Sequence, residues 1–148
     1  MKKFIFILLS LLLLCSCTTS KTVVSQNVNL SNYEYASIIN NDAYHIPAEL
    51  MEYEIQLFDA VENSRLKLVS DARIYELSPN QLKKLLLVKY GVNQNDEEAI
   101  VIVNFMDYMT GRPVASCRGA FGLGIDHAGD LKGAIKRLAK QISITFPK

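Results

Sequence analysis

The side chains best suited to covalent chemistry are one cysteine and two histidines. Cys117 would be a thiol nucleophile if a neighbouring base took its proton, and the chain offers His45 and His127 for that role. His45 precedes a predicted helix and His127 lies in a glycine-rich connection, so neither spacing forms a recognisable Cys–His pair. Because Cys117 shares a predicted strand face with apolar residues, we expect it to pack as a small buried hydrophobic side chain.

Two further groups of residues resemble ligand sites. Residues 119–124 (GAFGLG) reverse the glycine spacing of a dinucleotide-binding loop and lack a following Lys-Ser/Thr, so they indicate a strand end that needs glycine. Asp126, His127 and Asp130 are metal-ligand types, but no second cluster completes a coordination geometry. We expect Asp126 or Asp130 to cap the last helix. The sequence therefore predicts no catalytic, cofactor-binding or metal-binding residue.

One carboxylate interrupts an apolar helix face. Glu54 lies one turn after Leu50 and one turn before Phe58 in a predicted helix over 47–62. A buried glutamate would need a partner or a raised pKa. We interpret Glu54 as marking a gap between two packing faces, where one side reaches water.

The elements that position these residues follow from hydrophobic spacing and turn signals. Their order is predicted to be β-α-β-α-β-β-α, an α+β domain with a mixed four-stranded sheet and flanking helices. Strands are expected at 28–39, 66–77, 98–106 and 114–121, and helices at 47–62, from Ser78 to a stop at Gly91, and from Leu131 to Phe146. Residues 98–106 are apolar on both alternating faces, which predicts a central strand covered on two sides.

The start of the chain has the layout of a secretory signal peptide. Lys2 and Lys3 precede an apolar run over 4–14, which is too short to span a membrane as a helix. The following Leu14-Cys15-Ser16-Cys17 resembles the lipobox of bacterial lipoproteins, with Leu at −3, a small residue at −1 and cysteine at +1. Cys15 is the alternative, but Leu14 would then occupy −1, where a small residue is needed. The resemblance implies cleavage after Ser16 and lipidation of Cys17.

This resemblance also implies a location in the cell. Two or three acyl chains on Cys17, palmitate among them, would hold the protein stably on a bilayer. Thr18 is not the aspartate that retains such lipoproteins at the inner membrane, which favours the outer membrane, facing the periplasm. We therefore divide the chain into a signal peptide (1–16), a lipidated cysteine and tether (17–27) and one α+β domain (28–148).

The second half of the chain carries another resemblance. The strand-turn-strand AIVIVNFMDYMTGRPVASCRG and the helix ending in Thr145-Phe146-Pro147 resemble a group of small Gram-negative envelope lipoproteins. Relatives of that architecture include lipoprotein activators of penicillin-binding proteins and the lipoprotein of the curli secretion channel. The resemblance implies a binding or assembly role and transfers no active site.

Charge is unevenly distributed along the chain. A formal net charge of +1 and a pI near 7.7 argue against a nucleic-acid partner. Between Thr22 and Ser64 there are seven acidic residues and no Lys or Arg, whereas from Arg112 onward seven bases face two acids. Two interpretations stay open. Oppositely charged helices lie side by side and support each other, or the molecule has a bipolar surface that steers a protein, glycan or lipid partner.

These observations predict a membrane-anchored envelope lipoprotein that binds a protein or peptidoglycan partner without catalysis and without a cofactor. A small envelope hydrolase and a carrier of a lipid or apolar ligand are the alternatives. An exposed apolar patch would favour the binding module, and a large closed apolar cavity would favour the carrier.

Overall fold

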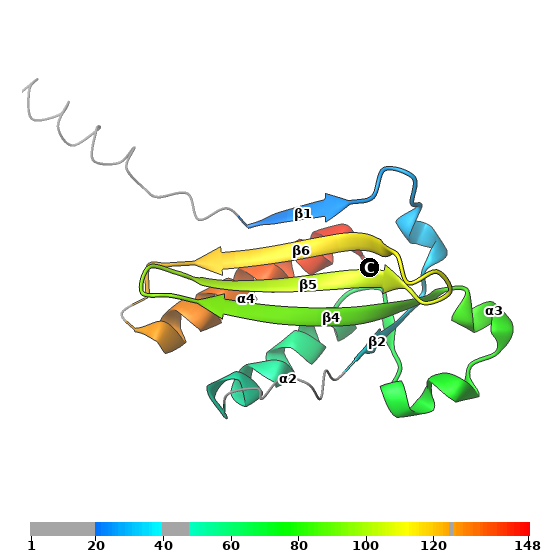
Figure 1. Ribbon diagram of the computed structural model, residues 1–148, viewed down its shortest axis with the longest axis horizontal. Helices are drawn as coiled ribbons and strands as arrows, with labels where there is room; N and C mark the ends of the chain where they lie inside the picture. The colour runs from blue at the N-terminus through cyan, green and yellow to red at the C-terminus, as the bar shows by residue number, and fades with distance from the viewer. Residues whose placement is uncertain (1–19, 40–47, 125) are drawn as a thin grey trace, which may run out of the picture.

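A six-stranded mixed sheet and two long helices form the part of the chain that the computed structural model describes, residues 20–39, 48–124 and 126–148 (Figure 1). The strands are β1 (Lys21–Val24), β2 (Tyr35–Ile38), β3 (Lys67–Leu68), β4 (Leu85–Gln94), β5 (Ala99–Asp107) and β6 (Pro113–Phe121). The long helices are α2 (Ala48–Glu62) and α4 (His127–Thr145), and the short ones are η1 (Leu30–Asn32), η2 (Asp71–Glu76) and α3 (Pro79–Leu82). The predicted α+β class is confirmed, but the sheet has six strands where four were predicted.

The sheet is built around an antiparallel meander of β4, β5 and β6. Its order is β1-β6-β5-β4-β2-β3, with β1 antiparallel to β6 and with β2 parallel to both β4 and β3. The predicted strand-turn-strand is confirmed as β5 and β6. Gly111 takes a φ of +69° in their connecting turn, a left-handed conformation that favours glycine.

Two predicted elements are wrong between β2 and β5. The predicted helix from Ser78 to Gly91 is only the four-residue α3, which begins with the expected capping box of Ser78 and Gln81. The residues after it form β4, because the apolar run that begins at Leu85 pairs with both β2 and β5. The predicted strand over 66–77 is limited to β3, and η2 replaces its second half.

The two terminal regions of the predicted domain also differ in detail. The expected strand over 28–39 is η1 followed by β2. Four residues of the predicted tether over 17–27 form β1, which pairs with β6. The first predicted helix is confirmed as α2, although its predicted start at Pro47 lies outside the described residues. The last helix is confirmed as α4.

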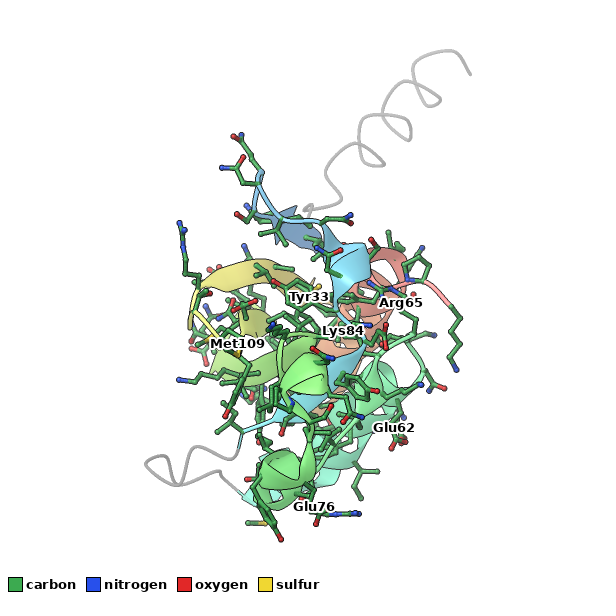
Figure 2. All side chains as sticks on the ribbon, turned by 90° about the vertical axis from the view of Figure 1, so that its right-hand side faces the viewer. Tyr33, Glu62, Arg65, Glu76, Lys84 and Met109 are labelled. Atoms are coloured by element: carbon green, nitrogen blue, oxygen red, sulfur yellow. The ribbon has the colours of Figure 1, made fainter. Side chains whose placement is uncertain are left out.

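The hydrophobic core lies between one face of the sheet and the two long helices. α4 covers β6 and β5, and α2 packs beside α4. In Figure 1 both helices lie behind the sheet, and the end-on view of Figure 2 separates the sheet from the helix layer. Phe105 of β5 and Phe146 after α4 are fully buried, with ring centroids 4.7 Å apart. Each such side chain contributes about 1.5–3 kcal/mol of burial free energy.

The opposite face of the sheet, which we call the outer face, is covered only in part. On β5, Val101, Val103 and Phe105 are buried toward the helices, whereas Ile100 and Ile102 point to the outer face and are half-buried. η2 contacts β2. In the described residues no long helix covers the outer face, so the expected two-sided cover of 98–106 is wrong. None of the helices described is long and apolar enough to cross a membrane.

Candidate functional site

The predicted lipidation residue, Cys17, lies outside the described residues, as does His45. The structure therefore adds no geometry for either. Its contribution is the position of β1, which begins at Lys21, four residues after Cys17.

Cys117 is a core residue. It is fully buried on the helix side of β6, where its Sγ lies 3.5 Å from the hydroxyls of Thr22 and Thr145. Burial raises the pKa of the thiol, against the effect of these two hydroxyl contacts, so the neutral form is favoured. His127 begins α4 and Thr145 ends it, eighteen residues later, which separates them by about 27 Å along the helix axis at 1.5 Å per residue. His127 therefore cannot serve Cys117 as a base.

The glycine-rich segment has a packing role. A Cβ on Gly119 would overlap the carbonyl oxygen of Ala134 and lie 2.5 Å from the backbone nitrogen of Leu138. β6 ends at Phe121, within the segment where a strand end was expected, and Gly119 lies inside the strand. The missing side chain of Gly119 lets α4 cross the strand closely. The backbone of Gly124 donates a 2.6 Å hydrogen bond to Asp130. These contacts give the segment a structural role, and it does not form a phosphate-binding loop.

The predicted cap of the last helix is confirmed at Asp126. Its side chain accepts a 2.7 Å hydrogen bond from the backbone of Gly129 at the start of α4. Asp130 is buried and accepts the bond from Gly124. Among the described residues, no three His, Cys, Asp or Glu side chains are grouped so that they could hold a metal ion.

Glu54 has a hydrogen-bond partner at the edge of the core. It accepts a 2.8 Å hydrogen bond from the phenol of Tyr90 on β4. Burial and this carboxylate raise the pKa of Tyr90 well above its ordinary value, so the phenol keeps its proton. Both residues line a cavity of about 20 Å³ between α2 and the sheet, with Leu57 and Ile135 nearby. The predicted gap is there, and it has room for about one water molecule.

A second polar cluster ties η1 and β2 to the rest of the fold. Arg65 donates 2.5 Å hydrogen bonds to the backbone carbonyls of Leu30 and Tyr33, and its guanidinium lies 5.7 Å from the centre of the Phe146 ring. Figure 2 shows Arg65 and Tyr33 at the same end of the molecule. The phenol of Tyr33 donates to Asp107 at 2.9 Å. The cluster joins η1, the segment after α2, the end of β5 and the end of α4. Its charged groups, on Arg65 and Asp107, both have hydrogen-bond partners.

The two oppositely charged helices do lie side by side. The phenol of Tyr53 on α2 donates to the backbone carbonyl of Ala128 on α4 at 3.3 Å. Lys132, Lys136 and Lys140 are exposed along α4. The predicted proximity of the two helices is confirmed, and their mutual support through opposite charge stays a prediction.

An open groove runs over the outer face at the end away from η2. It has a volume of about 330 Å³, and it is lined mainly by apolar surface with polar groups at its margin. Its lining residues are Lys89, Tyr90, Gly91, Val92, Asn93, Ile100, Ile102 and Asn104. Gly91 lies opposite Ile102 on the neighbouring strand, and a Cβ placed on it would meet nothing within 4 Å. Because Gly91 has no side chain, the face stays open beside Ile102.

The second exposed apolar surface lies on α2. Met51, Ile55 and Phe58 are 60%, 68% and 40% exposed. We call these three residues the α2 stripe. At 100° per residue they point away from the side that carries Tyr53 and Ala60 toward α4. The signal for a second face was the distribution of apolar residues around more than half of the helix.

No protein-family model and no curated protein sequence matches the chain. Solved structures do share its fold. A dodecamer of a leucine-to-methionine variant of PelC from Paraburkholderia phytofirmans matches with a TM-score of 0.56 and 13% identity, covering 86% of this chain and 98% of the other. The PelC dodecamer from the same organism matches with a TM-score of 0.55 and 11% identity, covering 88% of this chain and 98% of the other. A PDZ domain protein from Parabacteroides distasonis matches with a TM-score of 0.54 and 13% identity, and the match covers 87% of this chain but only 36% of that protein. The likeness is one of fold, and this fold occurs in a protein that forms a dodecamer.

Proposed function

We propose that this protein is a lipid-anchored, non-catalytic assembly module of the bacterial cell envelope, which acts by binding protein subunits that include further copies of itself. The observation that carries the proposal is the pair of exposed apolar surfaces, the groove of the outer face and the α2 stripe. Apolar patches of this kind, bordered by polar residues, are typical of protein-binding surfaces.

The fold comparison supports assembly. PelC, whose fold is similar over nearly its whole length, forms a dodecamer. At an identity of 11–13%, no residue role is transferred from PelC to this chain.

The proposed anchor would restrict where assembly takes place. The span from Cys17 to Lys21 is four residues, which reach at most about 14 Å when fully extended. A lipid on Cys17 would therefore hold the sheet close to the bilayer and place neighbouring copies in one plane.

The alternatives have less support. Cys117 contacts Thr145, which lies about 27 Å from His127 along the axis of α4, so a hydrolase that uses Cys117 and His127 as a pair is excluded. A lipid carrier would need a long apolar cavity, and the cavity described between α2 and the sheet holds about 20 Å³.

The anchor is tested by comparing Cys17→Ser with Cys15→Ser in cells given a clickable palmitate analogue. We expect Cys17→Ser to lose the label and to leave the membrane fraction, since the thiol is the acylation site. Cys15→Ser is the matched control and keeps both properties. A labelled, membrane-bound Cys17→Ser protein would refute the anchor.

Assembly is tested on the full chain extracted in a mild detergent. Size-exclusion chromatography with light scattering should give a protein mass of several copies. A protein that is monomeric at every concentration, and that cross-links to no other protein in intact envelopes, would refute the assembly role.

A further inference from the structure

We propose that copies of this chain join head to tail, with the α2 stripe of one copy lying in the outer-face groove of the next. The inference rests on the proposed assembly function and names the two surfaces that meet. One copy presents both surfaces on different sides, so each copy has one neighbour at its groove and another at its stripe.

The outer face lacks the cover that a sheet of this kind needs. Ile100 and Ile102 are half-buried at the centre of the groove, on the face opposite α2 and α4. A sheet with apolar residues on both faces is stabilised by a layer on each. A helix is a suitable second layer, because the first face of this sheet is already covered by helices.

The α2 stripe is the matching element. The same helix buries Leu57 and Val61 in its own core while it exposes Met51, Ile55 and Phe58. A helix that is apolar on two sides has a second surface to bury. Phe58 is the largest of the three side chains, and the space beside Gly91 would accommodate an aromatic ring.

Charge favours a second copy as the occupant. The sequence of α2 contains five acidic residues and no base, and Asp59 and Glu62 are exposed beside the stripe. The strand residues of the outer face include three bases, Lys21, Lys89 and Arg118. The turn at the groove's end adds acidic residues, of which Glu98 lies 3.8 Å from Arg118. Lys89 lines the groove, and Lys21 and Arg118 lie on the neighbouring strands of the same face. The acidic α2 would therefore meet bases at one side of the apolar groove, which orients one copy on the next.

The contact is heterologous, because the groove and the stripe are different surfaces. Such contacts build a ring where the rotation between copies closes and a filament where it does not. A two-fold dimer in which stripe meets stripe would bring the exposed acids beside one stripe, Asp59 and Glu62, near the same acids of the other copy, and this repulsion disfavours it.

Cysteine cross-linking distinguishes these arrangements. Phe58→Cys and Gly91→Cys are introduced together into the full-length chain, expressed in the membrane and oxidised with copper phenanthroline. We expect a ladder of dimers, trimers and larger species on non-reducing gels. Each single variant should give no ladder, since its cysteine would face a neighbour without one. Cys117 is buried, and the parent chain controls for the native cysteines.

The matched control replaces Phe58→Cys by Tyr75→Cys, which lies on η2 and is 81% exposed. Tyr75→Cys with Gly91→Cys should give no ladder. Equal ladders in both pairs would show random collision and overturn the proposal. Cross-linked dimers from Phe58→Cys alone would indicate a stripe-to-stripe dimer and also overturn it.

Charge reversal gives a second measurement that does not depend on oxidation. Asp59→Lys with Glu62→Lys, and separately Lys89→Glu, should each lower the assembled fraction at least tenfold, and the three changes together should restore part of it. An assembled mass unchanged in all of them would refute these surfaces and leave the assembly function standing, whereas a monomeric parent chain would refute both. If Lys89→Glu instead abolished binding to phosphatidylglycerol vesicles without changing the mass, the groove would face the membrane and the proposal would be wrong.

Discussion

Asp107 is the residue at which the β5–β6 turn is tied to the start of the domain. Its two carboxylate oxygens accept bonds from Tyr33 at 2.9 Å and from the backbone and hydroxyl of Thr110 at 2.7 and 2.8 Å. Burial opposes ionisation, but the hydrogen bonds from Thr110 and Tyr33 outweigh it and lower the pKa of Asp107. The same contact and burial raise the pKa of Tyr33 to about 12, so the proton stays on the phenol.

We expect Asp107→Asn to lower the free energy of unfolding at pH 7, by an amount that shrinks in acid. A carboxylate with a lowered folded-state pKa contributes stability above its ordinary pKa of 3.8, and loses it as the pH falls through the folded value. Urea titrations of both proteins at pH 7, 4 and 3 measure the difference. Asp96→Asn, in the exposed β4–β5 turn, is the control and should show no comparable loss. If the difference in the free energy of unfolding between Asp107→Asn and the parent did not change with pH, the lowered pKa of Asp107 would be contradicted.

The position of α4 over β6 depends on a glycine, which has no side chain at the point of contact. Gly119 lies where the backbone of α4 around Ala134 and Leu138 passes over the strand. Backbone atoms of a helix in a packed core do not move aside cheaply. The helix that supplies Leu138 and Ile142 to the core is therefore positioned by a glycine on the strand beneath it.

Gly119→Ala should destabilise the protein by about 3 kcal/mol, because overpacking against backbone displaces α4. Gly91→Ala is the matched control in the same sheet. Its added methyl group meets open space, so it should be neutral or stabilise by up to about 1 kcal/mol as glycine entropy is removed. Thermal unfolding followed by circular dichroism measures both. Equal effects of the two substitutions would contradict the close approach of α4.

The elements that local signals predicted well are those with one strong pattern. α2 and α4 show clear helical spacing, and the β5–β6 hairpin has alternation around a glycine turn. The failure at β4 has a physical reason. Leu82, Leu85 and Leu86 satisfy helical spacing, yet the apolar run gains more from pairing on two sides with β2 and β5 than from extending α3. Pairing between distant segments leaves no local trace.

At the scale of the whole molecule, each exposed apolar surface lies beside charged residues of one predominant sign. The acidic α2 carries the exposed stripe, and the outer face carries bases around an apolar groove. The uneven charge was visible in the sequence. The groove was not, because Gly91 was interpreted as a helix stop, and only the six-stranded arrangement shows which face of β5 lacks a cover.

Assembly through these surfaces should weaken as salt is added. Raising NaCl from about 50 mM to about 500 mM shortens the Debye length well below 10 Å and screens the attraction between α2 and the groove. Light scattering of the extracted full chain should show a falling protein mass. Lys132→Ala on the exposed side of α4 is the control and should leave the salt dependence unchanged. A mass that rises with salt would indicate association driven by apolar contact alone.

The position of β1 has a consequence for aggregation. β1 pairs with β6 along one side, and in the described part of the chain no strand pairs with its other side. An exposed strand edge is a template on which stray chains add and precipitate. If Cys17 carries lipid as proposed, Lys21 would lie within about 14 Å of the bilayer. The membrane would then restrict the directions from which another chain could reach the unpaired edge of the sheet, so the proposed anchor would also limit misassembly.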